Sequence, residues 1–155
     1  MANPPFYPVE ITMLVVLDAN VLFAGLISPH GASYQILSLA IGGTLTCAAT
    51  PALWAEYEEQ LHSERFLELT PLSLPQINDF LDYMASVIRP VRNDFVWRGI
   101  LLDEDDAIVA ESAYNANVDV LITFNVNHFQ TLQNQVSFQI QRPGEFLKTY
   151  KEQQS

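Results

Sequence analysis

Cysteine, basic residues and long apolar runs are all scarce in this 155-residue sequence. The single cysteine, Cys47, cannot form a disulfide within the chain, and its place between Thr46 and Ala48 in a predicted strand favours a packing role. No apolar run reaches the length of a membrane span, because Asp18 and Asn20 interrupt the most apolar stretch, residues 13–27. The first basic residue is Arg65, so the start of the chain lacks the positive region of a secretory signal. We therefore expect a reducing, cytoplasmic location.

The shortage of basic residues makes the chain strongly acidic. Eighteen acidic residues against seven basic ones give a formal charge of −11 at pH 7, the opposite of the usual nucleic-acid-binding surface. The hydrophobic fraction of 49% and charged fraction of 16% nevertheless fit a packed globular domain. The charge has two interpretations: general solubility, or several acids that converge on one site and need a cation there. Composition does not decide between them.

Apolar strands alternate with helices along the chain. Residues 13–17 (MLVVL) form a continuous apolar run, the pattern of a parallel strand buried on both faces. The alternation predicts an open α/β sheet of five mostly parallel strands in one domain, residues 13–150, with an N-terminal extension (1–12) and a short tail (151–155). The predicted strands are residues 13–17, 45–49, 87–91 (at an edge), 118–123 and 136–140, and the predicted helices are residues 20–27, 34–41, 51–61, 63–69, 73–86, 107–115, 127–132 and 143–150.

Capping residues mark several helix starts. Ser33, Thr50 followed by Pro51, and Ser73 are each predicted to begin the helix that follows them. The two glycines at 42–43 are predicted to end the second helix.

Polar side chains follow two of the predicted strands. Asp18 and Asn20 come directly after the first strand, and Thr123 and Asn125 come at the end of the fourth. In parallel α/β sheets the ligand crevice lies beyond the carboxyl ends of the strands, so we expect these residues over one crevice. Each pair also has a local explanation, because Asp and Asn cap helices and Thr and Asn make turn contacts.

Further acids lie on two helices. The apolar face of helix 51–61 leaves Glu56 and Glu58 on its two flanks, and the helical wheel does not choose between them. Residues 103–106 are four consecutive acids at a helix start, more than the helix dipole requires. Asp106 touches the apolar run behind it, so it is the member expected to be rigid and to face inward.

Taken in order, these segments resemble the PIN domain, and more narrowly the VapC-like toxin ribonucleases of bacterial and archaeal toxin–antitoxin pairs. The resemblance extends from Met13 to about Phe146 and rests on VVLDANVL, LWAEYEEQL, DEDDAIVAESA and VDVLITFNVNHF, in the expected order. It implies a three-layer α/β/α fold and an endoribonuclease that uses Mg²⁺ or Mn²⁺ to hydrolyse RNA phosphodiester bonds. It also implies a protein antitoxin and a homodimer, to which Phe80, Tyr83 and Trp97 are candidate contributors.

The resemblance assigns the metal-binding and catalytic residues. Asp18, Glu56 and Asp106 match the first, second and third acids of the family. Asn20 and Thr123 match polar residues that support the metal shell.

One departure from the family pattern concerns the fourth acid. Many members have it at or near the position of Asn125, an amide in this chain, and some toxin-like relatives also have Asn there; Asp103 and Asp105 are candidates to compensate. Together with the net charge, this keeps an alternative open: a catalytically weak or silent PIN domain that acts as a protein- or RNA-binding module.

The basic residues offer one candidate contact surface for RNA. Arg89, Arg92 and Arg98 form the densest basic stretch, which could equally be a solvated loop. Thr50 and Ser28, in loops near the same edge, are candidate phosphate contacts.

Other acid-centred classes fit less well. A phosphatase with an aspartyl nucleophile needs a second acid two residues after Asp18, where this chain has Asn20. A response-regulator receiver needs a lysine late in the sheet, but the two lysines, Lys148 and Lys151, lie in or directly after the predicted terminal helix. Three histidines, His30, His62 and His128, lack the spacing of zinc ligands, and a surface or packing role is expected for each.

Overall fold

A computed structural model of the chain describes residues 12–96 and 103–154. Five strands form one sheet in the order β3-β2-β1-β4-β5, and every neighbouring pair is parallel. The predicted class and strand number are confirmed. The elements are β1 (Met13–Leu17), α1 (Ala19–Ile27), α2 (Ala32–Ile41), β2 (Leu45–Ala49), α3 (Pro51–Leu61), α4 (Glu64–Leu69), α5 (Leu74–Val87), β3 (Arg89–Pro90), α6 (Glu104–Ala116), β4 (Val120–Ile122), the 3-10 helix η1 (Val126–Leu132), β5 (Gln139–Gln141) and α7 (Pro143–Gln154).

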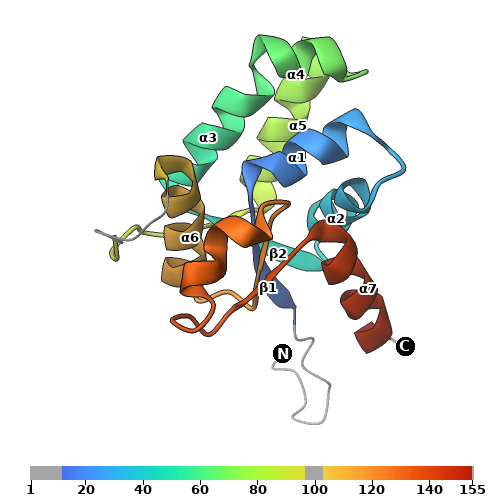
Figure 1. Cartoon of the computed structure of the whole chain (residues 1–155). Coiled ribbons are helices and arrows are strands. Elements are labelled where there is room, and N and C mark those ends of the chain that lie inside the picture. Colours follow the sequence, from blue (N-terminus) through green and yellow to red (C-terminus); the bar gives the residue numbers. More distant parts are fainter. Residues whose placement is uncertain (1–11, 97–102, 155) are drawn as a thin grey trace, which may run out of the picture.

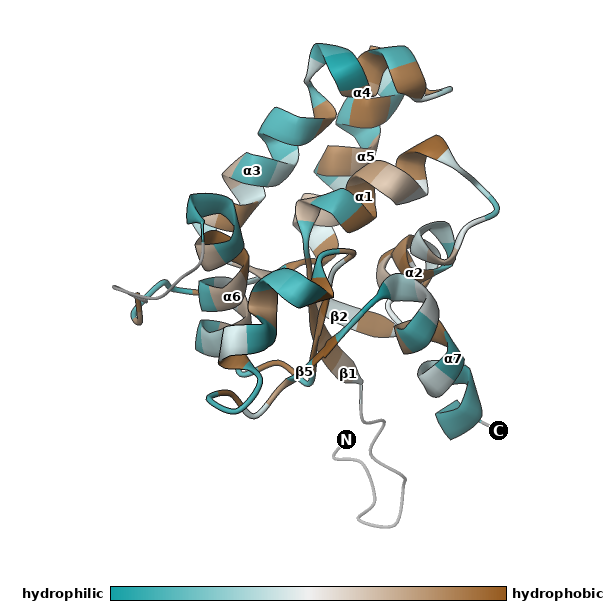
Figure 2. Ribbon diagram, viewed as in Figure 1, coloured by the Kyte–Doolittle hydropathy of each residue, from teal (hydrophilic) through white to brown (hydrophobic). Residues whose placement is uncertain are grey.

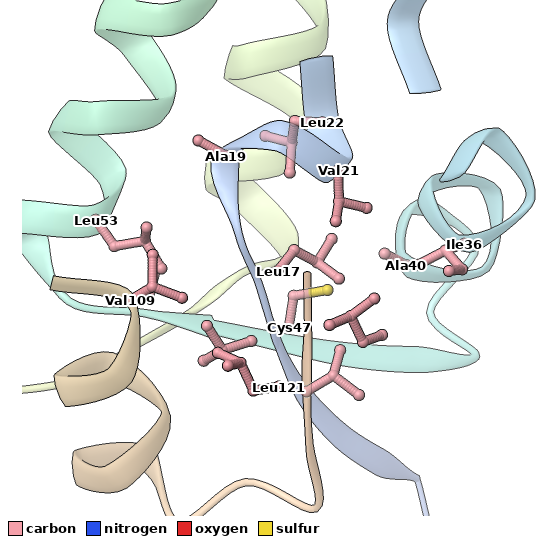
Figure 3. Close-up of a cluster of buried hydrophobic side chains, with 14 of the residues drawn as sticks. Leu17, Ala19, Val21, Leu22, Ile36, Ala40, Cys47, Leu53, Val109 and Leu121 are labelled. Carbon is pink, nitrogen blue, oxygen red and sulfur yellow. The ribbon is translucent and has the colours of Figure 1, made fainter. Parts of the chain in front are cut away.

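Helices cover both faces of the sheet, which gives three layers (Figure 1). α6 contacts β1 and β2 from one side, while α2 contacts β2 from the other and packs on α7. In Figure 3, Leu53 and Val109 approach Leu17 from one side, and Ile36 and Ala40 approach it from the other. Figure 2 shows that β1 and β2 are apolar, whereas the C-terminal end of α7 is polar. The buried strands explain the continuous apolar runs of the sequence.

The winding of the sheet reverses at β1. β2 and β3 follow on one side of β1, and β4 and β5 lie on the other. The carboxyl ends of β1 and β4 therefore border the crevice in which open α/β sheets bind ligands. The backbone N–H of Asp18 donates to the carbonyl of Ile122 at 2.9 Å, so the pairing of these strands continues to the edge of the crevice.

Two of the predicted helix caps are present. The Thr50 hydroxyl accepts from the N–H of Leu53 at 3.3 Å at the start of α3, with Pro51 in the first turn. Ser73 and Gln76 cap α5 reciprocally, each side chain accepting a hydrogen bond from the other residue's N–H. Both caps depend only on residues close in sequence, and both predictions are confirmed.

The predicted cap at Ser33 was wrong. α2 begins at Ala32, with Gly31 as its N-cap, and Ser33 lies buried inside the first turn. The backbone of Ser33 packs against Gly25 of α1, where an added Cβ would lie 3.1 Å from the Ser33 carbonyl carbon. The contact between two helices therefore sets this helix start.

The later elements differ in length from the prediction. β4 is limited to Val120–Ile122, and β5 is Gln139–Gln141 because its register is set by pairing with β4. β3 is only two residues long, at the sheet edge, and α7 continues to Gln154. None of the helices in the described ranges is long and apolar enough to cross a bilayer.

Candidate active site

Three carboxylates from three elements line one pocket at the crevice. Asp18 follows β1, Glu56 lies on α3 and Asp106 lies in the first turn of α6. The pocket has a volume of about 300 Å³. In Figure 1, α3 and α6 lie on the same side of the beginning of α1, and α3 contacts both α1 and α6. The other lining residues are Ala19, Asn20, Phe23, Gln60, Arg65, Asp103, Asp105, Asn125 and His128.

Asp18 is buried and held by the end of β4. The Thr123 hydroxyl donates to Oδ2 of Asp18 at 2.7 Å and accepts from the backbone N–H of Asn125 at 3.0 Å. Thr123 is fully buried, so one hydroxyl fixes the carboxylate relative to the neighbouring strand end. Burial raises the pKa of Asp18, and the Thr123 hydrogen bond opposes that rise. Asp18 also occupies the N-cap position of α1, as local sequence allows.

Asn20 and Asn125 lie on the polar side of the same pocket. The Asn20 Oδ1 accepts weakly from the N–H of Phe124 at 3.5 Å, which links the start of α1 to the chain after β4. Asn125 is exposed, and both Asn20 and Asn125 line the pocket. The expectation that Asp18 and Asn125 share one crevice is confirmed.

Glu56 is turned into the pocket, whereas Glu58 is exposed outside it. α3 is fixed beside β1 by Tyr57, whose hydroxyl donates to the carbonyl of Leu17. The Oε2 atom of Glu56 is buried and has no hydrogen-bond partner among the described residues. Burial raises the pKa of Glu56 to about 7, and the charges of neighbouring carboxylates, Asp105 first, add to that rise. Of the two flanking acids, Glu56 is the one at the site.

The four acids at the start of α6 lie in different surroundings. Asp103 is the N-cap, and its Oδ1 accepts from the N–H of Asp106 at 2.8 Å. Asp106 is only 8% exposed, in agreement with the expectation that it faces inward. Burial and the charge of Asp103 raise the pKa of Asp106, and His128 lowers it. Asp105 is exposed at the pocket wall, and Glu104 is exposed outside it.

His128 was missed by sequence reasoning. Its side chain is exposed, as a surface position predicts, but its Nδ1 lies 3.0 Å from Oδ2 of Asp106 at the wall of the pocket. Ligand atoms of Asp103, Asp106 and His128 all lie within 4.8 Å of one another. The only sequence signal was its place three residues after Asn125, in a helical turn that folds back over the strand end.

Arg65 was also missed. It lies on α4, its guanidinium sits 5.5 Å from the ring centroid of Phe23, and both residues line the pocket. No sequence motif marks it, because Arg65 reaches the pocket from α4, a helix that contacts α3. A cation thus stands beside the carboxylates.

Two predicted phosphate contacts lie outside the pocket. Thr50 is 1% exposed, and its hydroxyl is shared with Ser112 at 2.7 Å and with the start of α3, so it cannot reach a phosphate. Ser28 is the C-cap of α1, at the opposite end of that helix from Asp18. Capping and packing therefore explain the Thr50 side chain, and Ser28 caps α1 through its backbone N–H.

The arginine stretch also lies away from the carboxylates. Arg89 pairs with β2 at the sheet edge, and Arg92 forms an exposed ion pair with Asp94 at 3.4 Å. Arg98 and the aromatic Trp97 fall outside the described residues. Arg92 borders a larger, mostly apolar pocket of about 910 Å³ at the ends of β2 and β3, which also contains Trp54. That pocket has one carboxylate among its lining residues and cannot hold the same chemistry.

The carboxylate pocket fits a divalent cation. It offers oxygen donors from several elements, and the unpartnered Oε2 of Glu56 is a buried acceptor that needs a donor or a cation. The mutual repulsion that raises the pKa of Glu56 would be relieved by positive charge at the same place. Carboxylate oxygens are the ligands that Mg²⁺ and Mn²⁺ prefer.

Fold and site together define an α/β protein with carboxylates gathered where a parallel sheet reverses its winding. The PIN domain model matches residues 14–127, and the chain belongs to the PIN domain family. Its fold is similar to a chain in the crystal structure of VapBC2 from Rickettsia felis bound to a DNA fragment from their promoter, with 19% identity and a TM-score of 0.55. That match covers 84% of this chain and 98% of the other. Because the sequence identity is low, the comparison shows a shared fold. Comparison with curated proteins gave no match.

Proposed function

We propose that this protein is a metal-dependent endoribonuclease that hydrolyses RNA phosphodiester bonds with Mg²⁺ or Mn²⁺. The observation that carries the proposal is the gathering of Asp18, Glu56 and Asp106, from three separate elements, around one pocket. Membership of the PIN domain family supports the same activity. The cation and the RNA substrate are parts of the proposal.

The three carboxylates would hold the cation. Asn20, Asp103, Asp105 and Asn125 would complete its polar surroundings, partly through water, because Mg²⁺ retains several water ligands. A bound divalent ion supplies Lewis acidity and positive charge beside a scissile phosphate.

The residues of the chain would perform the remaining tasks. Thr123 orients the Asp18 carboxylate through its 2.7 Å hydrogen bond. One oxygen of Glu56 has no hydrogen-bond partner within the described part of the chain, and Glu56 would accept a proton from an attacking water. Arg65, at the pocket wall, would attract a backbone phosphate into an otherwise acidic site.

A toxin role in a toxin–antitoxin pair is the second part of the proposal. The similar chain belongs to a complex named VapBC2, solved on promoter DNA, and it shares this chain's fold. An acidic crevice would attract basic side chains of a protein antitoxin. A homodimer would use the exposed side of α5, where Tyr83 is 53% exposed and Phe80 is partly buried, and the site of action would be the cytoplasm.

Cleavage assays test the activity. Wild type is expected to cut single-stranded RNA with Mg²⁺ or Mn²⁺ and to stop in EDTA. Asp18→Asn and Asp106→Asn should each lower the rate by at least about a hundredfold, because each removes a charge from the site. Glu104→Gln, on the same turn as Asp106 but outside the pocket, is the matched control and should retain activity.

Two outcomes would contradict the proposal. Activity in EDTA, or a cleavage rate equal to that of wild type in both Asn variants, would exclude the carboxylate mechanism. RNA binding without cleavage under any divalent ion would instead favour the silent binding module.

A further inference from the structure

We propose that His128 is a nitrogen ligand of the divalent cation and makes the site select Mn²⁺, or a similar transition ion, over Mg²⁺. The inference rests on the proposed function, because it concerns the same pocket. It goes further in assigning one additional ligand and the class of metal that this ligand favours.

The spacing of the side chains carries the argument. Two neighbouring ligands of an octahedral ion, each about 2.1 Å from the metal, lie about 3.0 Å apart. Nδ1 of His128 and Oδ2 of Asp106 are 3.0 Å apart, and Asp103 offers an oxygen within 4.8 Å of both residues' ligand atoms. The pair therefore already stands at the separation that a shared ion requires.

The surroundings of His128 leave it free to bind. Its ring makes one hydrogen bond within the described residues, the contact with Asp106, and its side chain is 51% exposed. Its backbone N–H donates to the carbonyl of Asn125 at 2.9 Å, which turns η1 back over the pocket. His62, by contrast, is bound to Asn78 and to the carbonyl of Glu58, outside the pocket.

The charge of the pocket favours a neutral ligand here. Asp18, Glu56, Asp103, Asp105 and Asp106 already bring five carboxylates to its wall. A neutral imidazole adds a donor atom without adding repulsion. Mg²⁺ binds oxygen and has little affinity for imidazole, whereas first-row transition ions accept both kinds of ligand, with Mn²⁺ the weakest binder of the series. A mixed nitrogen and oxygen site thus shifts the preference away from Mg²⁺.

Pulsed EPR on the full chain with Mn²⁺ alone tests the assignment. Wild type should show the ¹⁴N modulation of a coordinated imidazole, and His128→Asn should lose it. The ratio of Mn²⁺ to Mg²⁺ affinities, from competition titrations, should fall by about tenfold or more in that variant. His30→Asn, an identical change at an exposed loop residue, is the control and should keep both properties.

A second variant covers the case in which His128→Asn folds poorly. His128→Asp restores a charged oxygen ligand, so it should bind Mn²⁺ without ¹⁴N modulation and should bind Mg²⁺ more tightly than wild type. Saturable Mn²⁺ binding by wild type without ¹⁴N modulation would overturn the role of His128 and leave the proposed function standing. No saturable Mn²⁺ binding at all would overturn both.

Discussion

At the scale of single residues, Glu56 is the least satisfied member of the site. It is half-buried, one oxygen has no hydrogen-bond partner within the described chain, and three pocket acids lie near enough to affect its ionisation. An ionised carboxylate in that position costs free energy unless a cation accompanies it. The ionised Glu56 carboxylate therefore lowers the free energy of unfolding of the metal-free protein, as expected for a side chain that binds a cation.

Glu56→Gln is predicted to remove a pH-dependent loss of stability. The folded-state pKa of Glu56 is about 7 against an ordinary 4.5, so the folded state binds the proton more tightly, and stability falls as pH rises through that window. Solvent screening of this half-buried group reduces the effect to about 1 kcal/mol. Urea denaturation in EDTA near pH 5 and pH 8 should show a larger loss in wild type than in Glu56→Gln, because the raised pKa values of Asp18 and Asp106 contribute to the loss in both proteins.

Glu58→Gln is the matched control, since Glu58 is exposed on the same helix outside the pocket. It should follow wild type at both pH values. The opposite sign, with wild type gaining stability relative to Glu56→Gln as pH rises, would mean that Glu56 is favourably paired in the metal-free protein.

At the scale of elements, those set by local sequence could be predicted, and those set by tertiary contacts could not. The strands β1 and β2 and the caps at Thr50 and Ser73 follow from residues close in sequence. The register of β5 and the start of α2 depend on β4 and on Gly25, partners that a single sequence does not reveal.

The site divides in the same way. Asp18 and Asp106 stand at element ends that the sequence marks clearly, and resemblance to the PIN domain was needed to choose Glu56 over Glu58. His128 and Arg65 reach the pocket from η1 and α4, whose placement depends on packing against the rest of the fold. Their contributions appear only once the chain is folded.

Thr50→Ala tests the assignment of Thr50 to folding rather than to RNA. The variant loses the N-cap of α3 and leaves the buried Ser112 hydroxyl without its 2.7 Å partner. The free energy of unfolding should drop by about 1–2 kcal/mol in urea titrations, with the cleavage rate per folded molecule unchanged. Ser28→Ala, at an exposed helix end, should be nearly neutral. A tenfold loss of cleavage by folded Thr50→Ala would restore it as an RNA contact.

At the scale of the whole molecule, a charge of −11 has to be reconciled with a polyanionic substrate. A bound divalent ion neutralises part of the pocket, and local cations must do the rest. Arg65 stands in the pocket, whereas Arg92 lies at the ends of β2 and β3, so the two would contact different parts of an RNA strand.

The two arginine positions are predicted to act differently. Arg65→Gln should slow cleavage by about tenfold, because its contact lies beside the reacting phosphate. The pair Arg92→Ala and Arg98→Ala should mainly weaken RNA binding and flatten its dependence on salt. Filter binding across a salt series separates the effects, and Arg142→Gln, bound to the carbonyl of Phe124 outside the pocket, serves as the control. Unchanged RNA binding by Arg92→Ala with Arg98→Ala at every salt concentration would exclude that basic stretch from the interface.

The central claim is that Asp18 after β1, Glu56 on α3 and Asp106 at the start of α6 share one divalent cation. Anomalous diffraction from a crystal soaked in Mn²⁺ measures this directly, without dependence on RNA or on turnover. The account predicts one strong peak in contact with Asp18, Glu56 and Asp106, absent from a crystal of Asp18→Asn. A Mn²⁺-saturated crystal with no peak between these carboxylates, or with its ordered ion elsewhere on the molecule, would contradict it.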